Sequence, residues 1–188
     1  LAVQNQQKNN LQVAENLYKE TLKTNPNHVD AHNNLGIIFK ELGELQKAVD
    51  CYQKVIQIQP DDAYAYYNLG LVFKELGEFK KAEDCFQKVI QIQPDQVEDA
   101  HVNLGLVFKE LGEPQKAINC YEKAIQINPN CAGAHNNLGN ILLELRAYQK
   151  AISCCEKGLQ IQPQSFEIHD LLIKIKWQNN YGNKSFID

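Results

Sequence analysis

The sequence predicts an all-α fold, a solenoid of stacked helix-turn-helix repeats. The first observation is a signature, Asn-Leu-Gly, that recurs at intervals of 34, 35 and 34 residues, beginning at Asn34, Asn68, Asn103 and Asn137. The second is helical spacing of the apolar residues between these signatures, and the third is glycine and proline at fixed places. A fixed period of this length is typical of stacked arrays, because one two-helix unit cannot bury its apolar face alone.

The stretch 67–94 shows how each repeat is built. Two sets of residues have the three-to-four spacing of one helix face, which indicates two helices. The first set is Tyr66, Leu69, Gly70 and Phe73, and the second is Ala82, Phe86 and Val89. Gly77 interrupts the pattern, and Pro94 ends the second helix because its ring and missing N–H cannot continue it. Mid-helix Gly70 costs about 1 kcal/mol relative to Ala in an isolated helix. Its recurrence therefore predicts that the second helix crosses very close, with Ala82 as the matching small contact.

These positions resemble the tetratricopeptide repeat family. Counted from Val29, Ala63, Glu98 and Ala132, the family pattern falls on Leu35, Gly36, Phe39, Ala48, Tyr52 and Pro60 in the first full copy. It recurs at Leu69, Gly70, Phe73, Ala82, Phe86 and Pro94, and at Leu104, Gly105, Phe108, Ala117, Tyr121 and Pro129. The fourth copy keeps Leu138, Gly139, Ala151 and Pro163, but Leu142 and Cys155 replace the aromatics and Arg146 replaces the turn glycine, which leaves the geometry of its turn open. The resemblance implies a right-handed superhelical solenoid with a partner-binding groove.

The expected organisation is a single solenoid over 1–178. Its parts are a partial repeat (1–28), four full repeats (29–62, 63–97, 98–131, 132–165), a capping helix (166–178) and a tail or linker (179–188). In the partial repeat we expect a shortened first helix, Leu1–Lys8, and a second helix, Leu11–Asn25. A one-residue insertion within 95–99 is expected to alter the next helix start. The capping helix is expected to have a polar outer side, with Trp177 docked on the last repeat or marking another contact.

Composition and charge exclude several classes of partner. The 188 residues are 44% hydrophobic and 22% charged, as in ordinary soluble chains, and 19 basic against 23 acidic residues give a net charge of −4. No Lys or Arg run forms a stripe that would neutralise phosphates, so nucleic acid is not expected as a partner. No apolar run approaches the roughly 20 residues that span a bilayer, so membrane insertion is not expected.

Repeated cysteines and histidines predict packing rather than chemistry. Cys51, Cys85, Cys120 and Cys154 share one position of successive repeats, about 8–10 Å apart if helices pack normally, whereas a disulfide needs Cα atoms about 4.4–6.8 Å apart. We expect them to be reduced, which favours a cytoplasmic location. His32, His101, His135 and His169 share a core-side position and are expected to pack or hydrogen-bond. Without motifs for catalysis, phosphate or metal binding, we expect no enzyme activity, catalytic residue, metal or cofactor.

The helix face opposite the core is the candidate binding surface. Positions 2, 6, 9 and 13 of each first helix share that face at 100° per residue, and position 6 is always Asn. A row of amides can donate and accept, and so can hold the backbone of an extended peptide; alternatively, the amides bond to a neighbouring helix. The repeat array of O-linked GlcNAc transferases is similar, and it recruits protein substrates through such a row. The predicted peptide-binding residues are Asn34, Asn68, Asn103, Asn137, Asn140, Ile37, Leu71, Leu106, Tyr64, Tyr67, Lys40, Lys74 and Lys109.

The sequence thus predicts a protein–protein interaction module that binds an extended peptide segment in a concave groove. The alternative is the substrate-recruiting segment of a larger enzyme, such as a glycosyltransferase or sulfotransferase, and a catalytic domain beyond Asp188 would distinguish the two. Self-assembly through the ends of the array is a third possibility, and the oligomeric state is left open.

Overall fold

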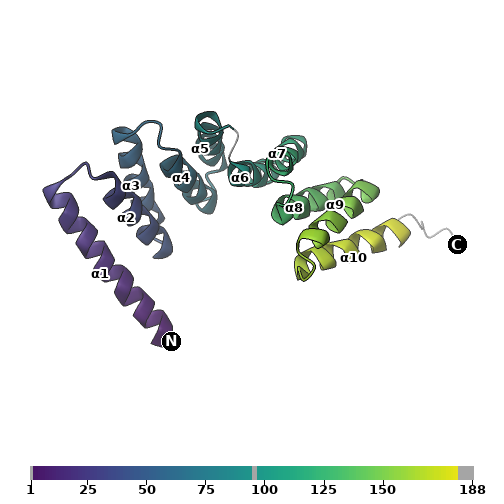
Figure 1. Cartoon of the computed structure of the whole chain (residues 1–188), viewed down its shortest axis with the longest axis horizontal. Coiled ribbons are helices and arrows are strands. Elements are labelled where there is room, and N and C mark those ends of the chain that lie inside the picture. Colours follow the sequence, from purple (N-terminus) through teal and green to yellow (C-terminus); the bar gives the residue numbers. More distant parts are fainter. Residues whose placement is uncertain (1, 95–96, 182–188) are drawn as a thin grey trace. The chain divides into compact units, whose positions relative to one another are not determined.

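The structure is a computed structural model that describes residues 2–94 and 97–181, with side chains described over 10–94 and 97–180. All of its elements are helices, so the predicted all-α fold class is confirmed (Figure 1). They are α1 (Ala2–Thr24), α2 (Val29–Glu41), α3 (Leu45–Ile58), α4 (Ala63–Glu75), α5 (Phe79–Ile92), α6 (Glu98–Glu110), α7 (Pro114–Ile127), α8 (Ala132–Glu144), α9 (Tyr148–Ile161) and α10 (Phe166–Tyr181).

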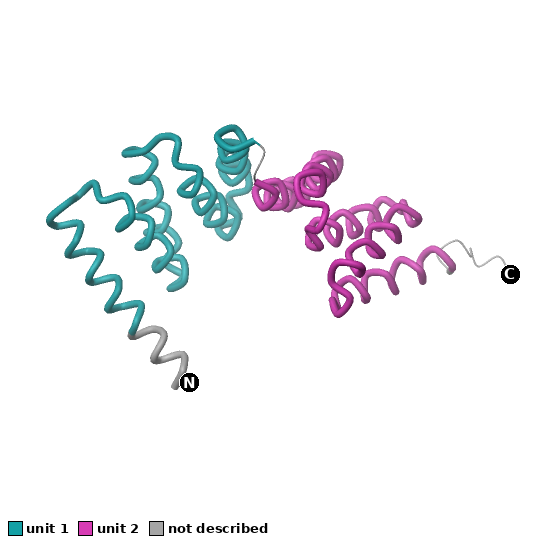
Figure 2. The backbone as a smooth tube through the Cα atoms, in the orientation of Figure 1, with its two compact units in different colours: residues 1–94 teal, residues 95–188 magenta. Residues whose placement is uncertain are grey.

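The chain forms two compact units, residues 1–94 and 95–188 (Figure 2). In the first unit, α2 pairs with α3 and α4 with α5 as helix-turn-helix hairpins, α3 packs on α4, and α1 packs on α2. In the second, α6 pairs with α7 and α8 with α9, α7 packs on α8, and α10 packs on both α9 and α8. Each unit is therefore a stack of two helical hairpins with one further single helix packed on it, α1 in the first unit and α10 in the second.

Each hairpin closes by placing an aromatic ring on a glycine. A Cβ added to Gly36 would lie 2.6 Å from Tyr52 Cζ, and one added to Gly70 would lie 2.9 Å from the ring of Phe86. Both rings are fully buried. The predicted close approach is confirmed. The atoms nearest to the place of a Cβ on Gly70 belong to Phe86 and Cys85, and the contact with Ala82 stays a prediction. The third hairpin repeats the arrangement, since a Cβ added to Gly105 would lie 2.5 Å from Cε1 of Tyr121.

The fourth hairpin closes differently because Cys155 replaces the ring. A Cβ on Gly139 would lie 3.4 Å from Cys155 Sγ and 3.2 Å from Cδ2 of Leu171. Leu171 belongs to α10 and is buried. The smaller thiol thus leaves room that a leucine from the following helix occupies, which makes α10 part of this repeat's core.

The turn inside each hairpin has the hydrogen bonds of a Schellman motif. At Gly77, whose φ is +74°, Gly77 N donates to the Lys74 carbonyl (3.1 Å) and Glu78 N to the Phe73 carbonyl (2.8 Å). Arg146 adopts the same left-handed backbone with a φ of 59°, and the two equivalent hydrogen bonds form, at 2.9 and 2.8 Å. The turn of the fourth repeat, whose geometry the sequence left open, therefore matches the glycine turns, because the motif holds the arginine in the glycine conformation.

The repeated histidine fastens one repeat to the turn before it. Nε2 of His135 donates to the carbonyl oxygen of Pro129 at 3.1 Å, and the same bond joins His32 to Pro26 and His169 to Pro163, each at 2.9 Å. Each proline ends the preceding second helix, so the histidine ties its own helix to that turn. The prediction that these histidines make packing or hydrogen-bond contacts is confirmed for these three.

The ends of the chain differ from expectation. The backbone runs as one helix from Ala2 to Thr24, so the expected break after Lys8 does not occur, because neither glycine nor proline interrupts this stretch. The helix α6 begins at Glu98, where Val97 provides no side-chain cap, while residues 95 and 96 of the expected insertion lie outside the described part. The outer side of α10 exposes Phe166, Ile173 and Trp177, so its predicted polar outer side is wrong.

The turn of the fourth repeat yields a stability prediction. Replacing Arg146 with Gly should raise the free energy of unfolding by about 1 kcal/mol, because a left-handed backbone costs a non-glycine residue about 1–2 kcal/mol, less the entropy that glycine adds to the unfolded chain. Urea unfolding followed by circular dichroism measures this. Gly77→Ala is the matched control and should lower stability, since nothing lies within 4 Å of the added Cβ and only the backbone opposes it. An unchanged or lowered midpoint for Arg146→Gly would show that the turn carries no strain.

The ring-on-glycine contact yields a second prediction. Gly36→Ala should destabilise by about 1–3 kcal/mol, because the new methyl group meets the buried ring of Tyr52. Gly139→Ala should be close to neutral, because its nearest neighbour is the tip of Leu171 and alanine gains up to about 1 kcal/mol of helix propensity. Thermal unfolding of both variants provides the comparison. Equal losses would contradict the role of the ring.

Candidate functional site

The four positions predicted to face away from the core are graded in exposure. In α2, Asp30 and Glu41 at the two ends are exposed, whereas Asn34 and Ile37 in the middle are half-buried. The same gradation holds in the other first helices, with Asn68, Leu71, Asn103, Leu106, Asn137 and Asn140 half-buried and Tyr64, Glu75, Asp99, Glu110, Gly133 and Glu144 exposed. Each first helix therefore presents a recessed amide and apolar residue between exposed ends.

The asparagine amides are hydrogen-bonded within their own helices. Asn34 Nδ2 donates to the Asp30 carbonyl oxygen at 2.7 Å, Asn68 Nδ2 to that of Tyr64 at 3.0 Å, and Asn103 Nδ2 to that of Asp99 at 2.9 Å. In Asn34 and Asn68 this bond uses one of the two amide hydrogens and leaves the Oδ1 acceptor to other partners. Each of these three bonds stays within one helix. The alternative interpretation required bonds to a neighbouring helix.

In α8 the bonded amide lies one turn further along. Asn140 Nδ2 donates to the Asn136 carbonyl oxygen at 3.0 Å, and Asn140 is at the position that Ile37, Leu71 and Leu106 occupy in the other repeats. Asn137 makes no such bond among the residues described. The fourth repeat thus offers two amides in place of one amide and one aliphatic side chain.

The two tyrosines predicted for this surface differ in environment. Tyr64 is exposed, whereas the half-buried Tyr67 ring packs edge-on against Phe86, with centroids 5.8 Å apart and an interplanar angle of 67°. Tyr67 therefore helps to hold α4 against α5, and of the pair Tyr64 is the one available to a ligand.

The predicted lysine row is also not uniform. Lys40 and Lys74 are half-buried, and burial, followed by the charge of Lys40, lowers the pKa of Lys74. Lys109 is exposed, and its Nζ lies 3.2 Å from Oε1 of Glu144 in the next repeat. Lys109 therefore bridges two helices.

Sequence reasoning missed two sets of buried positions. One position of the first helix is buried in every full repeat, and it holds Ile38, Val72, Val107 and Ile141. The sequence could have indicated this, because the residue there is always β-branched and aliphatic. The hydroxyls of Tyr52 and Tyr121 are also buried, and neither has a hydrogen-bond partner among the described residues. Burial is the main cause that raises the pKa of both phenols. The alternation of Tyr and Phe at this position was the only hint of these polar groups.

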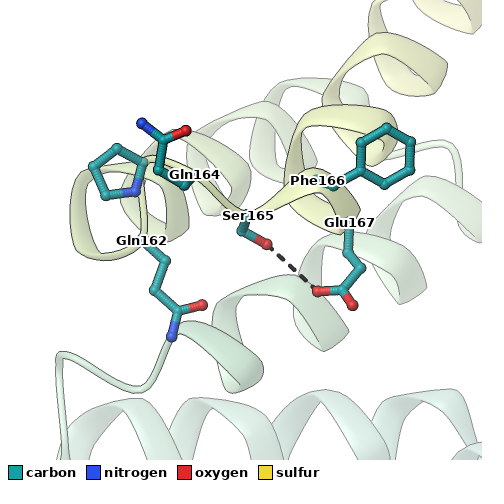
Figure 3. Close-up of a pocket in the computed structure, with 6 residues that line it drawn as sticks. Gln162, Gln164, Ser165, Phe166 and Glu167 are labelled. Carbon is teal, nitrogen blue, oxygen red and sulfur yellow. Dashed lines mark hydrogen bonds between the residues drawn. The ribbon is translucent and has the colours of Figure 1, made fainter.

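A shallow hollow lies away from this surface, at the turn between α9 and α10 (Figure 3). Its lining residues are Gln162, Pro163, Gln164, Ser165, Phe166 and Glu167. Ser165 Oγ lies 3.5 Å from Glu167 Oε2, and none of the six lining residues belongs to the predicted peptide-binding set.

The cysteines are free thiols, and their burial sets their chemistry. Burial raises the pKa of Cys85 to about 12 and the pKa values of Cys51 and Cys155 to about 11. Packing is confirmed for the buried Cys85 and Cys120, while Cys51 and Cys154 are half-buried. Within the part of the chain that the structure describes, no group of His, Cys, Asp and Glu is arranged to hold a metal, and no helix is long and apolar enough to cross a membrane.

Comparisons with known proteins agree with this architecture. A sequence profile described as "Tetratricopeptide repeat" matches residues 63–96, 98–131 and 132–165, a second of that description matches 17–50, and one described as "TPR repeat" matches 38–77. No curated protein matches. The hairpin stack and these matches define a helical-repeat protein of the protein-interaction class. The chain belongs to the tetratricopeptide repeat family.

Solved structures of similar fold cover most of the chain. The crystal structure of MamA is 29% identical with a TM-score of 0.78, over 86% of this chain and 94% of that one. YrrB, described as a TPR protein with an unusual peptide-binding site, is 20% identical with a TM-score of 0.72, over 89% and 85%. PilF of Pseudomonas aeruginosa is 21% identical with a TM-score of 0.76, over 96% and 89%. The last two similarities concern the fold.

The thiols yield a prediction about reactivity. At about pH 8, Cys51 should react with a maleimide faster than Cys85, because Cys85 is buried whereas Cys51 is only half-buried. Burial raises the pKa of both thiols, so exposure of the sulfur decides the order. Peptide mass mapping of timed reactions measures both rates. In urea the two rates should converge, and equal rates in the folded protein would contradict the packing of Cys85.

Proposed function

We propose that the chain is a non-catalytic interaction module whose recessed asparagines bind the backbone of an extended polypeptide. The observation that carries the proposal is the shared geometry of Asn34, Asn68 and Asn103, each of which donates one amide hydrogen to its own helix. That bond fixes the amide and so lowers the entropy that a ligand would otherwise have to remove. In Asn34 and Asn68 the remaining Oδ1 can accept from a peptide N–H, and the second amide hydrogen can donate to a peptide carbonyl.

The spacing of neighbouring repeats supports an extended ligand. In the first unit α2 contacts α4, as α6 contacts α8 in the second, and packed helices lie about 8–10 Å apart. A polyproline II chain rises about 3.1 Å per residue with three residues per turn, so the same edge of its backbone returns after about 9 Å. Asn34 and Asn68 would thus bind backbone groups one turn apart, as would Asn103 and Asn137. Recognition of backbone groups makes the binding tolerant of peptide sequence.

Side chains beside the amides supply the apolar part of the contact. Ile37, Leu71 and Leu106 are half-buried, so a peptide side chain packed on them completes their burial, at about 25 cal/mol per Å² of apolar area. The exposed Tyr64 adds an aromatic surface, and the half-buried Lys40 and Lys74 add positive charge on the same helices. YrrB, which shares the fold, is described as having a peptide-binding site. The six free thiols support a reducing, cytoplasmic location as part of this proposal.

The test is the quadruple variant in which Asn34, Asn68, Asn103 and Asn137 become Ala. If each amide contributes a net of about 0.5–1.5 kcal/mol, the variant should lose about 2–6 kcal/mol of binding free energy, at least about thirtyfold in affinity. The probe is a displayed library of random peptides, selected on the unmodified protein and titrated against both proteins. Stability should change little, because alanine recovers up to about 0.7 kcal/mol of helix propensity at each site.

A matched control removes four other amides. Gln57, Gln91, Gln126 and Gln160 share one exposed position of the second helices, and their replacement by Ala should leave peptide capture unchanged. Two double variants, Asn34→Ala with Asn68→Ala and Asn103→Ala with Asn137→Ala, show whether each unit binds separately. Unchanged capture by the quadruple variant would refute the binding role. A sharply lowered unfolding temperature would instead assign the row to helix packing.

A further inference from the structure

A row of exposed glutamates ends the first helices of the full repeats. The last residue of each of these helices is Glu41 in α2, Glu75 in α4, Glu110 in α6 and Glu144 in α8. The C-terminal end of a helix carries a partial negative charge, so a carboxylate at this place is electrostatically unfavourable. A cation bound beside the carboxylate removes that penalty. The repeated placement therefore favours a positively charged partner.

The second unit carries the larger excess of negative charge on its first helices. Together α6 and α8 contain four acidic residues and one lysine, a net charge of −3, whereas α2 and α4 contain three acidic residues and two lysines, a net charge of −1. Nζ of Lys109 lies 3.2 Å from Oε1 of Glu144, and among the described residues Glu110 makes no ion pair. Glu110 is thus an uncompensated carboxylate in the same row as a paired one.

A buried hydroxyl lies near the two glutamates of this unit. Tyr121 of α7 is fully buried, and its hydroxyl has no hydrogen-bond partner among the described residues. Its Cζ, which carries the hydroxyl, is 2.8 Å from the place of a Cβ on Gly105, so the hydroxyl lies beside α6, which contacts α8. Burial is the main cause that raises the pKa of Tyr121, and the charges of Glu144 and Glu110 are among the others. Phe86 closes the second repeat without a hydroxyl, so the fold does not require this polar group.

We propose that the polypeptide bound by the second unit carries a basic side chain, Arg or Lys, whose positive charge binds Glu110 and Glu144 over the Tyr121 hydroxyl. The inference rests on the proposed binding of a peptide backbone and adds the chemistry of one peptide side chain. Glu110 lies seven residues beyond Asn103, on the same face of α6 and about 10 Å further along the helix axis. The side chain of an Arg or Lys in a peptide held at Asn103 covers most of that distance, and the glutamate side chain covers the rest.

The hydroxyl of Tyr121 favours a charged ligand over a neutral one. In the free chain, a glutamate turned toward this buried hydroxyl would leave water without a counter-charge, which is costly. A bound cation supplies the counter-charge, so one carboxylate can accept hydrogen bonds from the hydroxyl and from the ligand together. Tyr121 thus acts through the glutamates, as a positioning residue, and its hydroxyl gains a partner when the ligand binds.

The test compares two pools of short fluorescein-labelled peptides. One pool has arginine and the other citrulline, its neutral analogue, at the central position, and all other positions are random uncharged residues. The protein is the full chain with Asn34→Ala and Asn68→Ala, so that only the second unit keeps its asparagine row. Anisotropy titration should give an affinity at least about fivefold higher for the arginine pool, because one cation meets two exposed carboxylates. The preference should shrink in about 0.5 M NaCl, which screens exposed charges.

Three further variants locate the preference for arginine. Glu110→Gln with Glu144→Gln should abolish it and leave the affinity for the citrulline pool unchanged. Tyr121→Phe should reduce it at least about twofold without lowering the unfolding temperature, because phenylalanine closes the second repeat equally well. Glu122→Gln with Glu156→Gln is the matched control, since it removes the same charge from an exposed position shared by α7 and α9, and it should keep the full preference.

The outcomes separate this inference from the proposed function. Equal affinity for the two pools, with both weakened by adding Asn103→Ala and Asn137→Ala, would overturn the basic side chain and leave backbone binding in place. Absence of binding by either pool would overturn both. Full preference in the double variant of the site glutamates, or its loss in the control variant, would overturn the site. Full preference in the tyrosine variant would remove the hydroxyl from it.

Discussion

The contact on which the first three full repeats depend is the aromatic ring that occupies the space of a missing side chain. Glycine in mid-helix costs about 1 kcal/mol of propensity, whereas burying a large apolar side chain contributes about 1.5–3 kcal/mol. Burial therefore outweighs propensity at Gly36, Gly70 and Gly105, whose rings are fully buried. This contact fixes which face of each first helix meets its partner. Because one face is fixed, the opposite face is fixed as well, and the asparagine always stands at its edge.

The edge position explains why asparagine is tolerated inside a helix. A buried amide would need several partners, and a fully exposed one would compete with the helix for backbone groups. Asn34 and Asn68 are half-buried, and each bonds a carbonyl one turn back in its own helix without interrupting that helix. The same bond that makes the residue compatible with the helix orients its amide, so local structure and the proposed recognition share one hydrogen bond.

The repeat architecture could be predicted from the sequence because the same pattern of apolar residues, glycine and proline occurs in four successive repeats. Glycine and proline mark the turns through their backbone chemistry, and of this signal the fourth repeat lacks only the turn glycine. The side chain nearest to Gly70 could not be predicted, since periodicity indicates the face of a helix but not which side chain fills a gap, and the ring of Phe86 fills this one. The turn at Arg146 was left open for a related reason, because one residue's preference does not show that two backbone hydrogen bonds outweigh it. The orientations of the asparagine amides depend on side-chain rotamers, and no spacing rule contains them.

The fourth repeat shows how the array changes toward its end. Cys155 takes the place of the ring, and Leu171 from α10 enters the space beside Gly139, so the core of this repeat extends into the next helix. Gly158, at another contact with α10, lies 2.8 Å from Ile168 Cδ1 measured from an added Cβ. Ile168, Leu171 and Ile175 are buried on one side of α10. Because a helix turns 100° per residue, Phe166, Ile173 and Trp177 lie on another side, which is exposed. The exposed apolar side of α10 therefore follows from a helix that packs well on one side while carrying apolar residues on two.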